Sequence, residues 1–173
     1  MSLFDRDRIL RLFDELSREL ARQGIRAEVF LVGGAAMALA YDSRRATRDV
    51  DAVFQPKEEV YAAAATVAAR HGLPDDWLND GVKGFLPGND PRAWSVYESD
   101  ALRVDVASPQ YLLAMKLLAA REQDVDDIVF LYRLCGFTSA AEGLDLVESV
   151  YPGRAIPPKV QFLLEEFFGP TGE

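Results

Sequence analysis

The sequence predicts an α+β fold, in which a small mixed β-sheet core is flanked by helices and continued by a C-terminal helical extension. Two observations favour this class. In the first part of the chain, segments with apolar residues every three or four positions alternate with short runs of β-branched and aromatic residues. Beyond a later pair of such short runs, every segment has helical character. The expected elements are, in order, helix 5–23, strand 28–32, helix 34–40, strand 49–54, helix 57–70, strands 94–98 and 101–107, and helices 111–121, 124–134, 139–150 and 158–168.

The first helix is predicted by a single apolar face. The members of this face recur at spacings of three and four, and they are Ile9, Leu12, Phe13, Leu16 and Leu20. Ser2 followed by Asp5 resembles a capping box with Asp in place of Glu, and Gly24 is placed to end the helix.

Glycine and proline mark the ends of the first two strands. Residues 28–32 form a β-branched and aromatic run that stops at Gly33 and Gly34, which is typical of a buried strand. Residues 49–54 begin with an alternation of Asp and apolar residues, and they stop before Pro56. Both segments therefore belong to the predicted sheet.

The longest irregular stretch is residues 73–91, which are rich in Pro, Gly, Asp and Asn. A loop of this length in a compact domain is often functional, and we expect Trp77 and Lys83 to close over a substrate. Residues 94–107 then form a hairpin, and Pro109 begins the helical part of the chain.

Length and composition indicate a soluble globular protein. The chain has 173 residues, of which 49% are hydrophobic and 27% are charged. We expect one structural unit, with residues 1–107 as the α/β core and residues 108–173 as a helical extension packed on that core. The chain has a single cysteine, no signal-peptide pattern and no apolar run near the roughly 20 residues that span a bilayer. These features favour a cytoplasmic protein with no membrane contact.

The formal charge of −9 argues against general nucleic-acid binding, because cationic contacts provide the affinity for phosphate. RNA binding through a local patch stays open. Arg44, Arg45 and Arg48 form the densest basic cluster of the sequence, and a solvated turn is an equally good interpretation. One histidine and one cysteine argue against zinc, and the glycines lack the spacing of a dinucleotide-binding turn.

Three carboxylates carry the predicted chemistry. Asp49 and Asp51 are two apart on a strand and therefore project to the same side, where they repel each other unless a cation lies between them. Mg²⁺, or Mn²⁺ in its place, removes this conflict. Asp105 lies on the polar face of a later strand. If the two strands are neighbours, the three carboxylates converge on a two-metal site; the alternative is that they are exposed strand or turn positions.

Gly33 and Gly34 directly follow a predicted strand and open a helix. Glycine allows a phosphate to approach the backbone closely, and the first N–H groups of a helix attract anions. By themselves the two glycines are also consistent with a tight strand-to-helix turn. Together with the carboxylates they favour a site for a metal-bound nucleotide.

These residues resemble a known signature. The blocks that carry the resemblance are Leu31-Val32-Gly33-Gly34, then Thr47-Arg48-Asp49-Val50-Asp51, then Asp105. They look like the signature of the nucleotidyltransferase superfamily, which has a DNA polymerase β-like fold. Arg45 and Thr47 are similar to the bacterial group related to AbiEii-type toxins of toxin–antitoxin systems. Residues 113–121, with Asp124 and Asp127, resemble the helical motif of that group.

The resemblance implies a role for each residue. Asp49, Asp51 and Asp105 are expected to be catalytic and to bind the metal, with Asp105 deprotonating the acceptor or binding a second ion. The residues expected to bind the nucleoside triphosphate are Gly33, Gly34, Thr47 and Lys116. The implied acceptor is an RNA, a protein or a small molecule.

Two further possibilities remain open at this stage. The fold could serve as a catalytically silent binding module or as a toxin–antitoxin component, which the acidic charge and the long Gly34–Asp49 gap favour. A homodimer could form through the last helix, which presents Phe162, Leu163, Phe167 and Phe168; these side chains could equally pack on the chain's own core.

Overall fold

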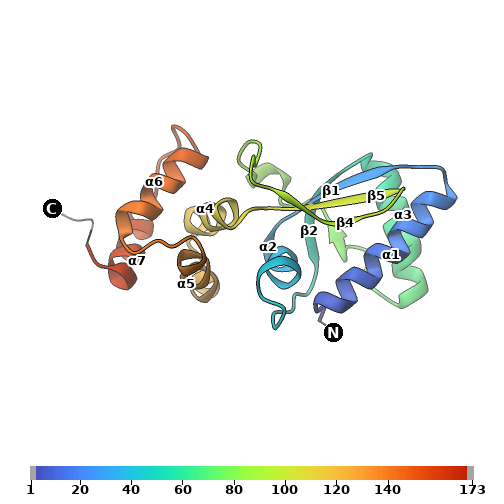
Figure 1. The fold of residues 1–173 in the computed structure, drawn as a ribbon, viewed down its shortest axis with the longest axis horizontal. Helices are drawn as coiled ribbons and strands as arrows, with labels where there is room; N and C mark the ends of the chain where they lie inside the picture. The colour runs from blue at the N-terminus through green and yellow to red at the C-terminus, as the bar shows by residue number, and fades with distance from the viewer. Residues whose placement is uncertain (1–2, 171–173) are drawn as a thin grey trace. The chain divides into compact units, whose positions relative to one another are not determined.

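The structure is a computed structural model that describes residues 3–170. The chain folds as two compact units. The first comprises the chain up to Gly84 together with Arg92–Ala107, and the second comprises Phe85–Pro91 and the chain from Ser108 onward. The described strands all belong to the first unit, and helices follow them to the end (Figure 1). The predicted α+β class, with a mixed sheet and a helical extension, is confirmed.

Five strands form one mixed sheet in the first unit. They are β1 (Ala27–Leu31), β2 (Val50–Gln55), β3 (Leu78–Asn79), β4 (Trp94–Glu98) and β5 (Leu102–Val106). Their order across the sheet is β3-β2-β1-β5-β4, so β1 is central. β1 is antiparallel to β2 and parallel to β5, while β3 is parallel to β2 and β4 is antiparallel to β5.

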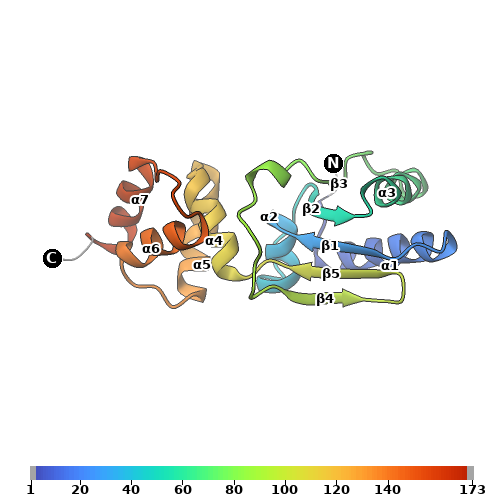
Figure 2. The same ribbon diagram turned by 90° about the horizontal axis from the view of Figure 1, so that it is seen from above.

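Helices cover one face of this sheet. They are α1 (Arg6–Arg22), α2 (Gly33–Ala36), which continues into a π-helical turn (Met37–Tyr41), and α3 (Lys57–His71). α1 and α3 pack on each other, α1 contacts β5, and α3 contacts β2. Along β1, Val29 and Leu31 are buried, whereas Glu28 is exposed and Phe30 is half-buried. This alternation is typical of a sheet with one core face and one open face. Figure 2 looks onto the open face, with α1 and α2 behind the strands.

The structure differs from the sequence prediction around residues 73–91. This stretch contains the short strand β3, which pairs with β2. The prediction that Trp77 closes over a substrate is wrong, because its side chain is 1% exposed and its Nε1–H donates to the carbonyl oxygen of Ala64 at 3.0 Å. An indole with its polar atom satisfied inside the protein belongs to the core.

The start of α1 also differs from the prediction. Asp5 is the N-cap, because its side chain accepts a hydrogen bond from the backbone N–H of Arg8 at 2.8 Å. Ser2, the other member of the predicted capping box, lies outside the described residues. The remaining predicted elements occur with ends shifted by one or two residues, which is the usual uncertainty of helix and strand ends.

The second unit consists of helices and a short leading segment. The helices are α4 (Pro109–Ala119), α5 (Val125–Leu134), α6 (Ala140–Val150) and α7 (Pro158–Phe168). Tyr132 links them, since its hydroxyl donates to the carbonyl oxygen of Ser139 at 2.6 Å and accepts from the N–H of Gly143 at 2.9 Å. Phe168 stacks on Tyr132 with ring centroids 3.9 Å apart. Burial raises the pKa of Tyr132 to about 12, so the hydroxyl stays protonated at neutral pH.

The side chains of the predicted dimer surface fall into two groups. Phe168 packs within its own unit, whereas Phe162 and Phe167 are 69% and 47% exposed. The homodimer itself stays a prediction. None of the helices between residues 3 and 170 combines the length and the apolar character needed to cross a bilayer.

Gly143 is predicted to tolerate no side chain. A Cβ at this position would overlap the hydroxyl of Tyr132 and lie 3.0 Å from Leu164 Cδ1. We expect Gly143→Ala to lower the free energy of unfolding by about 1–3 kcal/mol, because buried Tyr132 and Leu164 have little space to move. Urea unfolding would measure this loss. Gly88→Ala is the matched control, since no heavy atom of the described chain lies within 4 Å of its added Cβ. Equal stability of the two variants would contradict this account of the helical unit.

Candidate functional site

A glycine turn stands at the end of the central strand, directly against one of the predicted carboxylates. The N–H of Val32 donates to the carbonyl oxygen of Asp51 at 3.0 Å, so the β1–β2 pairing continues to the last residue before the turn. Gly33 then has φ of +65°, a conformation that L side chains rarely adopt. A Cβ on Gly33 would lie 3.1 Å from Asp51 Oδ2. The glycine turn and the Asp51 carboxylate therefore lie directly beside each other.

The second glycine of the turn faces Thr47. A Cβ on Gly34 would lie 2.8 Å from Thr47 Oγ1, which is closer than real Cβ atoms approach a neighbour. Thr47 Oγ1 donates to the carbonyl oxygen of Asp49 at 3.1 Å. The missing side chain at Gly34 thus makes room for the hydroxyl that holds the backbone of Asp49 in place.

The segment before β2 is fixed from the start of the chain. Phe4 and Thr47 form a two-way backbone bridge, with N···O distances of 2.7 Å and 2.9 Å. Phe4 is buried, and its ring centroid lies 6.5 Å from that of Trp77. The sequence prediction missed this anchor. The available signal was an aromatic residue placed just before the first helix and outside its apolar repeat.

Asp49 and Asp51 lie on either side of the first residue of β2. Asp51 is half-buried on the strand, and Asp49 precedes the strand and is exposed. In the β2–β3 pairing Asp51 is opposite Asn79, so a side-chain amide lies beside the carboxylate on the same face. Sequence reasoning missed Asn79, because a two-residue strand within an irregular stretch leaves no periodic pattern.

Asp105 shares the open face of the sheet with Asp51 but is not its neighbour. The register pairs Phe30 with both Val53 and Asp105, and Asp51 projects to the same side as Val53. The condition for convergence of the three carboxylates, that the two aspartate strands be neighbours, is not met, because β1 lies between β2 and β5. With about 4.8 Å between adjacent strands, Asp51 and Asp105 start roughly 10 Å apart or more.

Asp105 also has a cationic partner of its own. Its Oδ1 accepts from Arg103 Nε at 2.9 Å. Between residues 3 and 170, no group of three or more His, Cys, Asp or Glu side chains is close enough to hold a metal ion. The structure therefore brings together Gly33, Gly34, Thr47 and Asp51, with Asp49 adjoining, and it leaves Asp105 apart from them.

Lys116 belongs to an ion-pair cluster in the second unit. Its Nζ lies 2.8 Å from Asp124 Oδ1 and 2.9 Å from Asp127 Oδ2, and Arg121 Nε lies 2.7 Å from Asp124 Oδ2. Burial by itself would raise the pKa of Asp124, but Lys116 and Arg121 outweigh it and lower that pKa below its ordinary value. A charge so nearly buried is stable only with such partners. The predicted contact of Lys116 with a nucleotide stays a prediction.

Comparison with protein families identifies a family to which the chain is similar. A family model described as "nucleotidyltransferase of unknown function (DUF6036)" matches residues 7–132, well over half of the chain. The matched region runs from the first turn of α1 through most of α5, so it includes the glycine turn, the three aspartates and the Lys116 cluster. No curated protein and no solved structure matches the chain.

Lys116 is predicted to be essential to the stability of the second unit. We expect Lys116→Met to lower the free energy of unfolding by about 3–5 kcal/mol, because Asp124 and Asp127 would keep their burial and lose the cation that they share, which leaves Arg121 as the cationic partner of Asp124. Chemical unfolding at pH 7 would measure the loss. Lys159→Met is the matched control, since Lys159 is exposed and we expect a change within about 0.5 kcal/mol. A Lys116→Met variant as stable as the control would contradict a structural role.

The pH dependence of the same variant gives an independent check. The folded-state pKa of Asp124 is lowered, so its contribution to stability is present above the unfolded-state pKa of about 3.9 and is lost as the pH falls through the lower folded-state value. Lys116→Met should therefore lose less stability than wild type when the pH is lowered through this range.

Proposed function

Because the chain belongs to this family of nucleotidyltransferases, we propose that it transfers a nucleotidyl group from a nucleoside triphosphate, with Asp49 and Asp51 holding Mg²⁺ beside the turn of Gly33 and Gly34. One observation carries the proposal. The carboxylate of Asp51 lies where a side chain on Gly33 would meet it at 3.1 Å. Triphosphate binding needs a carboxylate-held cation and an unobstructed backbone at one place, and the closeness of Asp51 to Gly33 supports a site that would provide both.

The donor set fits Mg²⁺, and equally Mn²⁺. Such an ion is commonly held by one or two carboxylates, and its other positions are filled by substrate phosphates and water. Asp49 and Asp51 supply the two carboxylates, so a third one close by is not required. When bound, the ion would neutralise charge on the triphosphate and activate the α-phosphorus toward attack.

The chain's own residues then have separate tasks. Gly33 and Gly34 present backbone without side chains, which lets phosphate oxygens approach the N–H groups. Thr47 is a positioning residue, since its hydroxyl holds the carbonyl oxygen of Asp49. In the transfer, a bond forms between the acceptor oxygen and the α-phosphorus, the bond from that phosphorus to the bridging oxygen breaks, and pyrophosphate leaves.

Asp105 is proposed as the base that takes the proton of the acceptor hydroxyl. Its position across β1 from Asp51 argues against a shared ion, and its place on the same open face supports a role toward the acceptor. Of the two roles that the family resemblance implies for it, the geometry favours this one.

The finer grouping is part of the proposal as well. Arg45, Thr47 and the helix around Lys116 support a relationship to AbiEii-type toxins, and hence a bacterial toxin–antitoxin setting. The acceptor would be an RNA, a protein hydroxyl or a small molecule. A chain with a single cysteine, Cys135, is consistent with the cytoplasm as the place of the reaction.

A second candidate is a nucleotide-binding module without turnover. The absence of a three-carboxylate cluster between residues 3 and 170 favours it. Titration calorimetry with each NTP and Mg²⁺, followed by a search for pyrophosphate release, separates the two candidates. Binding without release supports the module, and failure to bind any NTP contradicts both.

Asp51→Asn is predicted to abolish transfer. We expect labelling of cell extract from α-³²P-labelled NTPs to fall by at least about 100-fold, since even groups that only support a metal ligand contribute roughly 10–100-fold. Asp75→Asn is the control, because it removes an exposed carboxylate away from the turn. Labelling by Asp51→Asn at the level of Asp75→Asn would refute the proposed function.

Asp105→Asn is predicted to separate catalysis from nucleotide binding. We expect it to lower kcat by on the order of 100-fold or more while the Kd for NTP with Mg²⁺ stays near the wild-type value, because a general base acts on the acceptor. Asp51→Asn should instead weaken NTP binding that depends on Mg²⁺. A loss of Mg²⁺-dependent affinity in Asp105→Asn would show that Asp105 holds the ion after all.

A further inference from the structure

Arginines form a row along the outer side of α1. Residues three and four apart share one side of a helix, and this spacing relates Arg8, Arg11, Arg18 and Arg22, with Glu15 between them. The core-facing side of the helix is opposite and carries Phe13, Leu16 and Leu20 among others. We call Arg8, Arg11, Arg18 and Arg22 the α1 arginine row. The chain as a whole has a net charge of −9, so this row is a local concentration of positive charge on an acidic protein.

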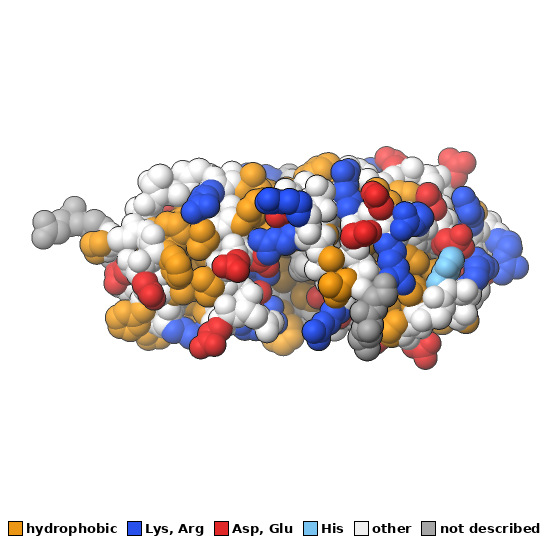
Figure 3. All heavy atoms as spheres, turned by 90° about the horizontal axis from the view of Figure 1, so that it is seen from below, with side chains coloured by type: hydrophobic (Ala, Val, Ile, Leu, Met, Phe, Trp, Pro, Cys, Tyr) orange, Lys and Arg blue, Asp and Glu red, His pale blue; other side chains and the backbone are white. Residues whose placement is uncertain are grey.

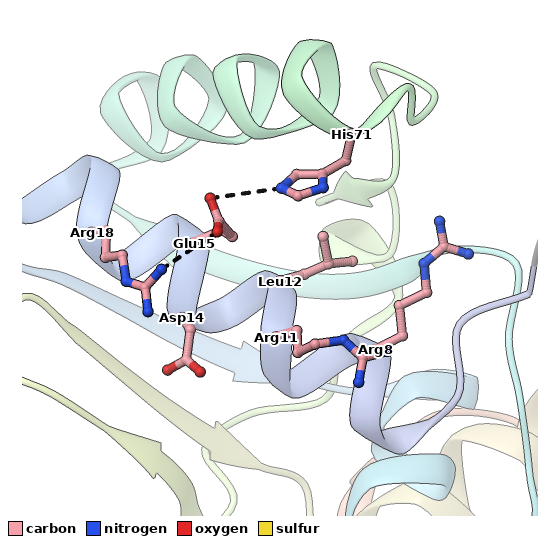
Figure 4. A pocket seen from close by; sticks show the side chains of 7 residues that line it. All are labelled: Arg8, Arg11, Leu12, Asp14, Glu15, Arg18 and His71. Atoms are coloured by element: carbon pink, nitrogen blue, oxygen red, sulfur yellow. Dashed lines mark ion pairs between the residues drawn. The ribbon is translucent and has the colours of Figure 1, made fainter.

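The row borders a pocket of about 350 Å³. Figure 4 shows its lining side chains, which come from α1 and from the end of α3. They are Arg8, Arg11, Leu12, Asp14, Glu15, Arg18 and His71. On the face of the molecule that Figure 3 shows, basic side chains gather around the single histidine, with acidic ones between them.

Arg11 and Arg18 are the cations of the row that are most available to a ligand, because Arg22 pairs with the buried Glu19 and the guanidinium of Arg8 lies over the Phe4 ring. Arg11 is exposed and makes no hydrogen bond or ion pair within residues 3–170. Arg18 is 75% exposed and lies 3.5 Å from Glu15. Glu15 is held mainly by Arg70, whose Nη1 is 2.7 Å from Glu15 Oε2 and whose hydrogen bond lowers the pKa of Glu15. The negative charge of Glu15 is therefore compensated chiefly by Arg70 of α3.

The row begins beside the candidate site. Phe4 is bridged to Thr47, and the guanidinium of Arg8 lies over the Phe4 ring, 4.8 Å from its centroid. Thr47 in turn lies against Gly34. From Arg8 the row runs fourteen residues along the helix to Arg22, a rise of about 21 Å. It therefore leads away from the glycine turn as a line of cations.

We propose that the α1 arginine row binds the phosphodiester backbone of a polynucleotide strand, and that the end of this strand is the nucleotidyl acceptor. The second part of the proposal rests on the proposed function, because it names the acceptor class of the same site. Arginine suits phosphate, since its planar guanidinium donates two parallel hydrogen bonds, and α1 contains no lysine.

Other partners fit the row less well. A membrane surface would require exposed apolar side chains among the cations, and Leu12, the apolar side chain that lines the pocket with them, is only 4% exposed. A single small anion would occupy the pocket and leave Arg22 unused. The cluster of Arg44, Arg45 and Arg48 is a weaker candidate for RNA, because Arg44 and Arg45 both pair with Asp42, at 3.1 Å and 3.4 Å.

The test is binding of a 5′-fluorescein-labelled 20-nucleotide RNA by anisotropy, without NTP or Mg²⁺, over a series of salt concentrations. A DNA strand of the same sequence is the second arm. Arg11→Gln/Arg18→Gln is compared with Arg133→Gln/Arg154→Gln, which removes the same charge from exposed arginines of the second unit. Thermal unfolding confirms that each variant folds.

We expect Arg11→Gln/Arg18→Gln to weaken binding on the order of tenfold near 0.1 M salt, and the slope of log K against log salt to fall by roughly 1.4, the value for two lost single-strand phosphate contacts. The control variant should bind like wild type. Equal weakening by both variants, or no binding of either strand by wild type at low salt, would overturn the proposal. Stronger competition by polyglutamate than by unlabelled RNA would also overturn it, in favour of an acidic protein.

The outcome is independent of the transfer reaction. Asp51→Asn, which is expected to abolish labelling, should bind the strand like wild type. If Arg11→Gln/Arg18→Gln labels an added RNA as well as wild type does, the acceptor assignment is wrong and the proposed nucleotidyl transfer still stands. If Asp51→Asn labels normally while the arginine variant loses binding, the proposed function is wrong and the binding surface stands.

Discussion

The candidate site depends on one close approach, that of the Asp51 carboxylate to the backbone of Gly33. A single methyl group at Gly33 would lie 3.1 Å from the carboxylate oxygen, and the left-handed backbone at this residue already disfavours any side chain. Two backbone pairings hold the approach in place. The β1–β2 ladder extends to Val32 and Asp51, and the Phe4–Thr47 bridge fixes the segment that enters β2. The backbone of the site is thus positioned by main-chain hydrogen bonds.

Charges serve opposite purposes in the two units. In the second unit Lys116, Asp124 and Asp127 are nearly buried and satisfy one another, so the cluster acts chiefly on stability. In the first unit Arg11 and Arg18 lie in solvent, where ion pairs add little to stability. Arg11 makes no ion pair within the described chain, so its contribution to folding is small. The proposed binding to a polyanion would give it a function.

The sequence predicted those parts of the fold and site that depend on local pattern. The apolar repeat of α1, the alternation of β2 and the glycine turn are each contained in a few consecutive residues, and the structure has all three. The proximity of the glycines to Thr47 and Asp51 follows from the order of strand, turn and strand. Strand order across the sheet is not local, so nothing in the sequence indicated that β1 separates Asp105 from Asp51. Phe4 and Asn79 were missed for the same reason, because each matters only through a partner far along the chain.

The separation of Asp105 from the pair has a consequence for the proposed chemistry. A transfer site must accommodate the α-phosphate, the attacking hydroxyl and the leaving pyrophosphate roughly in line. Carboxylates on adjacent strands would leave about 5 Å for them, whereas strands on either side of β1 leave roughly 10 Å. On the open face, the half-buried Phe30 of β1 lies between Val53 and Asp105 in the register, and Asp51 is two residues from Val53 along β2. The central strand therefore separates the proposed nucleotide side of the site from the proposed acceptor side. This separation favours different chemical roles for Asp51 and Asp105.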